Sequence, residues 1–224
     1  AATFPVVWFG SVFALPKVTR QIALEAQLGQ SLGKGFEVPV GGGATLKVAS
    51  CNDLFAADAR GLDMRGATHE AYRYFALSCY AARAISQAQP SRTSAVQDFK
   101  LDETAVRQLP AALWPLAAAE QRPAGTAPRV RFGDQVGGAQ YKVTDTPDSR
   151  QVEVTDVHGN NQDIAWVARG DFDHDGLEDL LLATHDSPAG GDQGFQLLVL
   201  SRRATDAPLA IRQRFAVNGP RHTP

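Results

Sequence analysis

The sequence has no long apolar run and no run of basic residues. Its opening segment, residues 1–9, is too short to span a bilayer and lacks the basic start of an export signal. We interpret Ala1 as the start of a mature chain, and a removed leader would make the protein an exported one. Lys and Arg are scattered and the net charge is −2, so nothing indicates a nucleic-acid partner or a transmembrane segment.

Cysteine is scarce. Cys51 and Cys79 are the only two, and neither stands in the Cys-x-x-Cys spacing of a zinc or redox site. We predict a disulfide between them, because an even pair is typical of proteins from oxidising compartments. Two buried free thiols are the alternative, since Cys79 lies on the apolar face of a predicted helix. A bridge would fasten a predicted loop, Asn52 to Gly66, to that helix.

Catalytic motifs are also lacking. The chain has no Gly-x-Ser-x-Gly elbow, no His-Glu-x-x-His pair and no phosphate-binding loop. Carboxylate pairs for glycoside hydrolysis could be drawn from Asp63, Glu70 or Glu103, but any protein offers such pairs. We therefore predict that the protein is not an enzyme. The five histidines are interpreted as surface residues: His69, His158, His174, His185 and His222.

One segment carries a clear chemical pattern. Residues 170–182 read Gly-Asp-Phe-Asp-His-Asp-Gly-Leu-Glu-Asp-Leu-Leu-Leu. In calcium loops of this spacing, side chains at positions one, three and five and the carbonyl at position seven point inward, while a glycine at position six makes a sharp turn. Position nine binds directly or through a water. The predicted ligands are Asp171, Asp173, Asp175, the Leu177 carbonyl and Asp179.

Crowded carboxylates repel one another, so a bound cation is a simpler account of this segment than a plain acidic turn. Oxygen-only ligands favour Ca²⁺ over zinc or copper. His174 occupies the outward-pointing fourth position. Position twelve is Leu182, where an EF-hand carries a bidentate Glu, so we expect an affinity near that of extracellular calcium modules.

The residues around the loop predict strands and not helices. Asp163 to Ala168 alternates in polarity, and an apolar run from Leu180 to Ala183 follows the loop. Over residues 162–184 the chain resembles the strand-loop-strand calcium repeat of FG-GAP and VCBS proteins, found in integrin-type propellers and bacterial exported proteins. The resemblance implies one bound Ca²⁺. Because the motif occurs once and no internal repeat is present, we predict no propeller.

The fold class predicted is α+β, with a mainly helical region at 1–120 and an antiparallel β domain at 121–224. A helix is expected after Thr68, stopping before Pro90, and a shorter one after Asp102. The aromatic residues of the first helix are assigned to core packing, with a ligand groove as the alternative. Further expected elements are one or two strands in Phe4–Leu15, a helix in Lys17–Leu28 and a strand in Ala44–Ala49.

A polar, proline-containing stretch at 119–128 is the predicted linker, and a run of short strands follows it. His158 to Asn161 is a predicted hairpin turn. Consecutive short strands favour a meander, as a sandwich or a curled sheet. The predicted strands are Arg129–Phe132, Gln140–Thr144, Gln151–Val157, Asp163–Ala168, Leu180–Thr184, Phe195–Ser201 and Leu209–Phe215.

These features predict a non-enzymatic, periplasmic or secreted binding protein with one structural Ca²⁺ and a protein partner. At the level of fold, small exported proteins of this kind are similar to immunity proteins and lysozyme inhibitors, which block toxins that degrade cell walls or lipids. The alternatives are an exported hydrolase with a calcium-stabilised loop and an adhesive or envelope-scaffold module.

Overall fold

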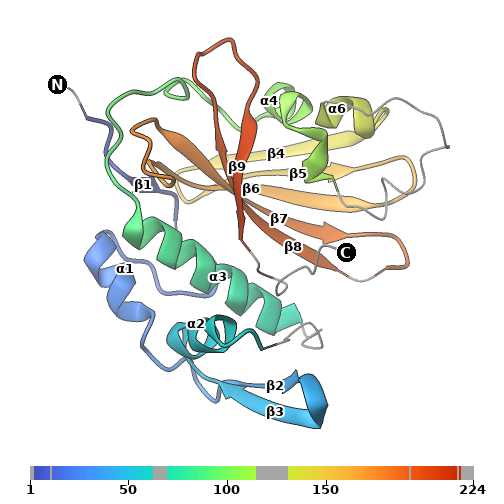
Figure 1. Cartoon of the computed structure of the whole chain (residues 1–224). Helices are drawn as coiled ribbons and strands as arrows, with labels where there is room; N and C mark the ends of the chain where they lie inside the picture. Colours follow the sequence, from blue (N-terminus) through green and yellow to red (C-terminus); the bar gives the residue numbers. More distant parts are fainter. Residues whose placement is uncertain are drawn as a thin grey trace.

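The computed structural model describes residues 3–10, 12–62, 70–114, 131–191, 193–215 and 217. Helices dominate its N-terminal half and strands its C-terminal half, so the predicted α+β class is confirmed (Figure 1). The helices of these ranges are α1 (Gln21–Gln27), α2 (Cys51–Ala59), α3 (Glu70–Gln87), α4 (Glu103–Gln108) and α6 (Phe132–Gln135), with short 3₁₀ turns η1 (Gly41–Gly43) and η2 (Ala111–Leu113).

The C-terminal strands form one open antiparallel sheet in the order β4-β5-β6-β7-β8-β9. A seventh strand, β1, pairs with the last residues of β6 and stands beyond the end of β5. The predicted meander is therefore a single sheet and not a sandwich within the described residues. The strands are β1 (Val7–Trp8), β4 (Gln140–Thr146), β5 (Ser149–Thr155), β6 (Asn161–Gly170), β7 (Asp179–Ser187), β8 (Gly194–Ser201) and β9 (Ala210–Phe215).

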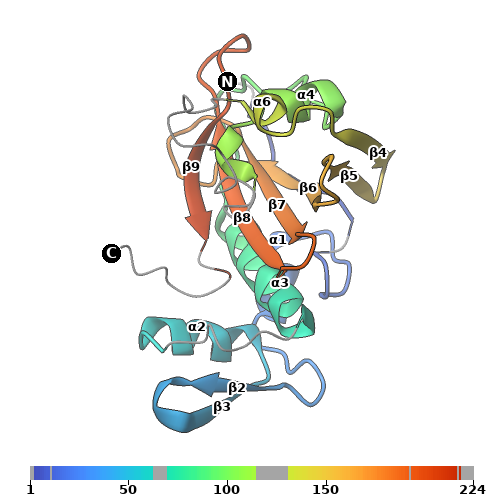
Figure 2. The ribbon, with the colours of Figure 1, turned by 90° about the vertical axis from the view of Figure 1, so that its right-hand side faces the viewer.

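The central strands are buried on both faces of the sheet. Along β7, Leu181 and Ala183 join the core cluster that contains α3, whereas Leu180 and Leu182 join the cluster that contains α4. Such a strand reads as a continuous apolar run because neither face meets water. Helices accordingly cover both faces, with α3 on one and the α4–α6 segment on the other (Figure 2).

Helix α3 is the main element on the first face. Eleven of its residues are buried, and Tyr72, Phe75 and Tyr80 are each at most 5% exposed. The assignment of the aromatic residues to the core is thus confirmed for these three. The helix ends at Gln87, before Pro90, as predicted. The predicted cap, Thr68, lies outside the described residues.

In the N-terminal region, the helix predicted in Lys17–Leu28 and the strand predicted at Ala44–Ala49 are present, whereas α2 and the partner of that strand were not predicted. Ser50 and Asp53 form a reciprocal capping box that starts α2, so the loop predicted from Asn52 is a helix as far as Ala59. A two-stranded hairpin, β2 (Phe36–Val40) with β3 (Ala44–Val48), lies beyond α2, away from the sheet (Figure 1). Cys51 and Cys79 form a disulfide between α2 and α3, which confirms that prediction.

The second face is covered by short elements. Asp102 caps α4 by accepting a hydrogen bond from the Ala105 amide at 2.8 Å, and the ring of Trp114 packs on Phe132 with centroids 5.4 Å apart. Only the last two residues of the predicted strand Arg129–Phe132 are described, and there the strand is not continued, since Phe132 begins α6. Gly133 allows α6 to lie close to α4, since a Cβ at position 133 would stand only 3.0 Å from the Cβ of Arg107.

Three other expectations concern the chain's organisation. Within the described residues of the apolar stretch 4–15, only Val7–Trp8 forms a strand. The turn from β5 to β6 is present, with the Asp156 carboxylate accepting hydrogen bonds from the amides of His158 and Asn160 at 2.8 and 2.9 Å. The linker at 119–128 lies outside the described residues, and the boundary at 120 stays a prediction.

Candidate metal centre

The acidic loop joins two neighbouring antiparallel strands, as the flanking sequence predicts. Gly170 at the end of β6 pairs with Asp179 at the start of β7. The eight residues between them turn the chain back on itself at one end of the sheet. Gly176 has φ +88° at the predicted sharp turn, a value that glycine adopts without a Cβ penalty.

Three of the predicted ligands meet in this loop. One carboxylate oxygen each from Asp171, Asp173 and Asp179 lies within 4.8 Å of the others. Oxygens that bind Ca²⁺ at 2.3–2.6 Å stand at most about 5 Å apart on opposite sides of the ion. The cluster therefore has the dimensions and the ligand atoms of a site for a hard cation.

Asp179 supplies a second, independent sign of a ligand. Its side chain is fully buried; Oδ2 accepts a hydrogen bond from the Phe172 amide at 2.9 Å. Oδ1 is also buried and makes no well-formed hydrogen bond in the described part of the chain, although the Ser201 hydroxyl, likewise without a partner, lies beside this carboxylate. Burial raises the pKa of Asp179 to about 6, and the charges of Asp173 and Asp175 act in the same direction. A cation in the loop would give this buried oxygen a partner.

The backbone of the loop is organised around Asp171. Its Oδ1 accepts a hydrogen bond from the Asp175 amide at 3.1 Å, and its Oδ2 accepts one from the Gly176 amide at 2.9 Å. His174, in the predicted outward position, is exposed and has φ +62°. Asp171 therefore holds the loop closed with its side chain while the other carboxylates converge on it.

Asp175 and Leu177 take part differently from the three gathered carboxylates. Oδ1 of Asp175 accepts a hydrogen bond from the Leu177 amide at 2.8 Å. Oδ2 of Asp175 lies 3.8 Å from Nη2 of Arg212. Within the described ranges no backbone amide donates to the Leu177 carbonyl. The roles of Asp175 and Leu177 as ligands stay predictions.

Sequence reasoning missed the segment that clamps the loop from outside. Asp171 and Gln89 exchange backbone hydrogen bonds at 2.9 and 3.0 Å, and the Arg92 amide donates to the Gly176 carbonyl at 2.8 Å. The Glu178 amide donates in turn to the Thr93 carbonyl at 2.8 Å. The chain just after α3 therefore borders the loop. About eighty positions separate the two segments, so no local pattern could have indicated this contact.

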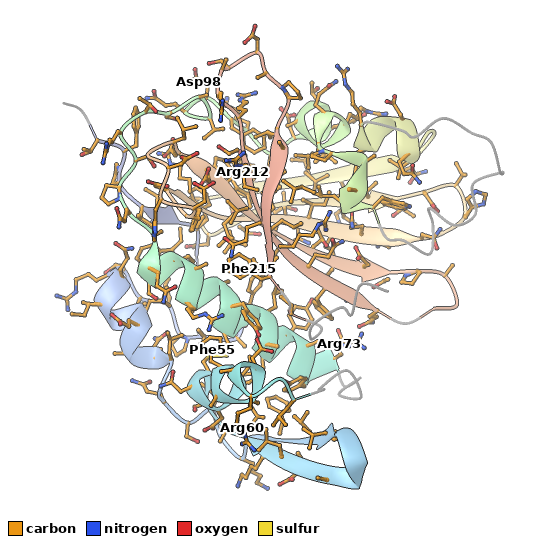
Figure 3. The ribbon with its side chains drawn as sticks, viewed as in Figure 1. Phe55, Arg60, Arg73, Asp98, Arg212 and Phe215 are labelled. Atoms are coloured by element: carbon orange, nitrogen blue, oxygen red, sulfur yellow. A yellow bond between two sulfur atoms is a disulfide. The ribbon has the colours of Figure 1, made fainter. Side chains whose placement is uncertain are left out.

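Two charged residues beside the loop were also missed. Arg212 on β9 places Nε 3.3 Å from Oδ2 of Asp173 (Figure 3). Glu178 is only 1% exposed, accepts a hydrogen bond from the Ser94 hydroxyl at 2.5 Å and lies 3.5 Å from Nε of Arg169. Glu178 is thus turned toward its own partners and away from the acidic cluster.

The remaining candidates do not form a second centre within the described residues. His158 and His174 are exposed as predicted, whereas His185 is half-buried, stacked on Phe195 with ring centroids 4.5 Å apart. The surface interpretation of His185 is therefore wrong, because β7 packs under α3 at this point. Glu70 and Glu103 stand at the starts of helices on opposite faces of the sheet. Asp63, His69 and His222 lie outside the described residues.

Comparisons with known proteins give no assignment. No family model, no curated protein and no solved structure matches this chain. Among the described helices, none has the length and apolar character that crossing a membrane requires. The likeness to FG-GAP and VCBS repeats therefore rests on residues 162–184 alone.

Proposed function

We propose that this protein is an exported binding protein whose acidic loop holds one structural Ca²⁺. The observation that carries the proposal is the buried, unpartnered Oδ1 of Asp179 beside the carboxylates of Asp171 and Asp173. Oxygen ligands in a flexible loop suit Ca²⁺ better than zinc or copper. Asp175 and the Leu177 carbonyl would complete the coordination.

The ion would strengthen the contact between the sheet and the helical layer. The loop lies at the end of β6 and β7, and the segment that borders it directly follows α3. An ion held there therefore stabilises the contact between these two parts of the chain. With no bidentate ligand at Leu182, we expect a dissociation constant of ~10⁻⁴ M, which suits the calcium concentrations outside the cytoplasm.

The Cys51–Cys79 disulfide supports an oxidising compartment, and we place the protein in the periplasm or outside the cell. Within that setting we propose a non-enzymatic role, as an inhibitor of the immunity-protein type that binds an envelope-targeting toxin. Two of the groups with shifted pKa values serve the fold: Asp53, whose pKa is lowered first by the Ala49 amide, caps α2, and Arg107, whose pKa is raised by Glu103, forms a pair within α4. Asp163 and His185 shift each other's pKa across the contact between β6 and β7.

The ion is tested by calorimetry and thermal unfolding with Ca²⁺ and with a chelator. At calcium about ten times the dissociation constant, linkage predicts roughly 1.4 kcal/mol of added stability. Asp173→Ala should abolish this gain, and Gly176→Val should do so by placing a β-branched residue at positive φ. His174→Ala is the matched control and should keep it. An equal calcium response in wild type and Asp173→Ala would refute the proposal.

The binding role needs a separate experiment. Products of genes adjacent to this one would be purified and mixed with the protein, and complexes would be sought by size-exclusion chromatography. The expected result is a stoichiometric complex that suppresses a lytic activity of the partner. Turnover of peptidoglycan, lipid or glycan by this protein alone would contradict the non-enzymatic assignment and favour the hydrolase alternative.

A further inference from the structure

A small pocket opens directly beside the acidic loop. It has a volume of about 260 Å³, and Asp175 and Leu177 of the loop form one of its sides. The end of β8 and the chain leading into β9 form the other side. That second side contributes three arginines, Arg202, Arg203 and Arg212. The pocket thus combines one edge of the candidate metal centre with a group of guanidinium side chains.

The arginines are placed by different contacts. Arg212 lies against the carboxylates of Asp173 and Asp175, at 3.3 and 3.8 Å. The Nε of Arg202 donates a hydrogen bond to the Ala95 carbonyl at 2.9 Å, which fixes the start of its guanidinium, while Arg203 is exposed. Guanidinium groups bind carboxylates through paired hydrogen bonds in a fixed geometry. The pocket is therefore suited to a carboxylate.

The charge of this region depends on the ion. Glu178, the fifth carboxylate of the loop, is paired with Arg169; the four aspartates of the loop and the three arginines of the pocket then leave one net negative charge when no cation is bound. A divalent ion changes this balance to one net positive charge. An incoming carboxylate would be repelled in the first state and attracted in the second, and the effect is strong because the groups lie a few Å apart.

We propose that this pocket binds an Asp or Glu side chain of the partner protein, and that it does so only when the loop holds its cation. The inference rests on the proposed function and adds to it the chemistry of the partner. The ion would then have two effects, since it would stabilise the loop and switch the adjoining pocket to a carboxylate receptor.

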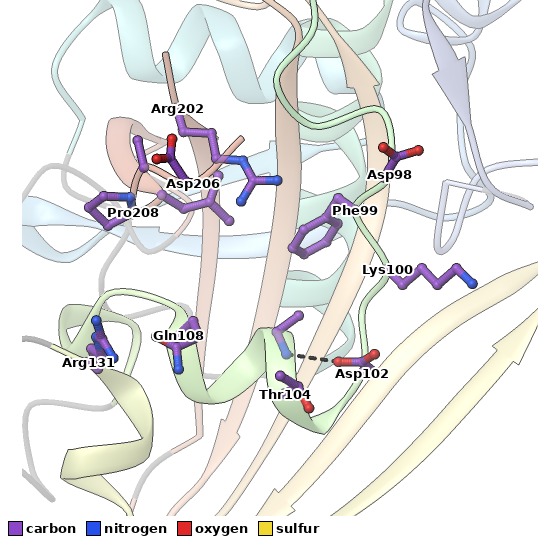
Figure 4. A pocket seen from close by; sticks show the side chains of 13 residues that line it. Asp98, Phe99, Lys100, Asp102, Thr104, Gln108, Arg131, Arg202, Asp206 and Pro208 are labelled. Atoms are coloured by element: carbon purple, nitrogen blue, oxygen red, sulfur yellow. Dashed lines mark hydrogen bonds between the residues drawn. The ribbon is translucent and has the colours of Figure 1, made fainter. Parts of the chain in front are cut away.

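A second pocket next to the first gives a bound segment room to continue. It has a volume of about 450 Å³ and shares Arg202, Ala207 and Pro208 with the smaller one. Figure 4 shows Arg202 and Asp206 on one side of it and Phe99 on the other. Its remaining charged residues have both signs. It therefore offers apolar and mixed polar contacts for the residues that flank the acidic one.

The test uses N-acetyl-aspartate N-methylamide as a probe, with the asparagine analogue as its neutral match. The Nε–Hε signals of the arginines are followed by NMR in the full chain, with Ca²⁺ and with a chelator. We expect the Arg202 and Arg212 signals to shift saturably with the acidic probe in calcium. Affinity should fall by roughly tenfold without the ion, because the local charge changes sign. The neutral probe should cause no shift.

Arg203→Gln separates this inference from the proposed function. It should weaken probe binding by about fivefold, the loss of one charged hydrogen-bonding group, and leave calcium binding within twofold. Arg60→Gln, beside α2 and across α3 from β9 (Figure 3), is the control and should change neither. Calcium binding without any probe shift would overturn the carboxylate pocket alone. Absence of calcium binding would overturn the proposed function. Tighter binding of inorganic phosphate than of the acidic probe would refute the protein-partner assignment.

Discussion

Two of the contacts that hold helix α3 and the chain just after it in place differ in their chemistry. Within the helix, the disulfide from Cys79 to Cys51 is fully buried in an apolar cluster and fastens α2 on the side away from the sheet. Just beyond its end, Gln89 and Arg92 hydrogen-bond to a loop crowded with carboxylates. The first contact is covalent and indifferent to ions. The second depends on what neutralises the carboxylates.

This difference shows how one helix can have one contact of constant strength and another whose strength varies with conditions. Apolar burial and a covalent bond keep α2 in place under all conditions in which the disulfide persists. The loop has buried carboxylates and an unpartnered oxygen, so we expect its stability to change with ion binding and pH. We therefore expect local opening to begin at the loop and not at the disulfide.

Removing the disulfide should have the largest effect. Cys51→Ala with Cys79→Ala frees a link across 28 positions, and the chain-entropy model gives a loss of about 3.5 kcal/mol. Urea unfolding with and without Ca²⁺ measures it. The same loss of unfolding free energy with and without Ca²⁺ would support two independent contacts. A loss that disappears in calcium would show that the disulfide and the loop contact are energetically coupled.

The second largest effect is expected for Asp179→Asn in the loop. Its effect on the free energy of unfolding should differ in sign without and with Ca²⁺. Asp179→Asn removes a buried charge whose Oδ1 has no partner, so without Ca²⁺ the variant should be at least as stable as wild type at pH 7. With Ca²⁺ it should lack the gain of roughly 1.4 kcal/mol. Thermal unfolding in both conditions checks this. A variant less stable than wild type in chelator would contradict the unpartnered state of Asp179.

The same residue predicts a pH dependence in the absence of calcium. Burial raises the pKa of Asp179 to about 6, so the folded state binds a proton more tightly than the unfolded state does. Stability should therefore rise as the pH falls from 7 through 6 toward 4. Asp179→Asn should flatten this rise. Unfolding curves collected in chelator across that range provide the measurement.

A third contact of α3, at Tyr74, predicts a smaller effect. The Tyr74 hydroxyl lies 3.2 Å from Nδ1 of His185, which is 3.7 Å from Oδ2 of Asp163. Asp163 raises the pKa of His185, and His185 in turn lowers that of Asp163. The contact between Asp163 and His185 therefore stabilises the folded state fully between about pH 4 and pH 6.5. This stabilisation is lost as the pH rises through the raised pKa of His185 or falls through the lowered pKa of Asp163.

Asp163→Asn tests this contact. Its destabilisation, within about 1 kcal/mol for a partly exposed pair, should be largest between about pH 4 and pH 6.5 and shrink above the pKa of His185. Unfolding of wild type and variant over this range gives the difference directly. A difference that grows steadily up to pH 9 would contradict the pairing.

The smallest change sharpens the description of the loop. Arg212 lies against the outer oxygens of Asp173 and Asp175, where it would compete with the proposed cation. Arg212→Ala should therefore raise calcium affinity by about two- to fivefold, as removal of one screened charge predicts. Arg214→Ala, two residues further on the same strand, is the matched control. Weaker calcium binding in Arg212→Ala would show that the arginine assists the site.

Several elements could be predicted because their causes lie close together in the chain. Helix α3 follows from apolar residues at helical spacing, and the start of α4 follows from Asp102 as its cap. Helix α2 was missed, although Ser50 and Asp53 form its capping box, because its apolar face is short. At Phe132 the apolar pattern correctly indicated a buried residue but not its backbone conformation, since Phe132 begins α6 and packs against Trp114.

The sequence by itself determined the acidic loop between two strands. The aspartate spacing, Gly176 and the apolar flanks all lie within about twenty positions, where steric and charge preferences act directly. Only the tertiary structure decided what borders the loop. Arg212 is 39 positions from Asp173, and Gln89 is about eighty from Asp171. Local patterns record which face of an element is buried, but which surfaces meet depends on how the whole chain packs.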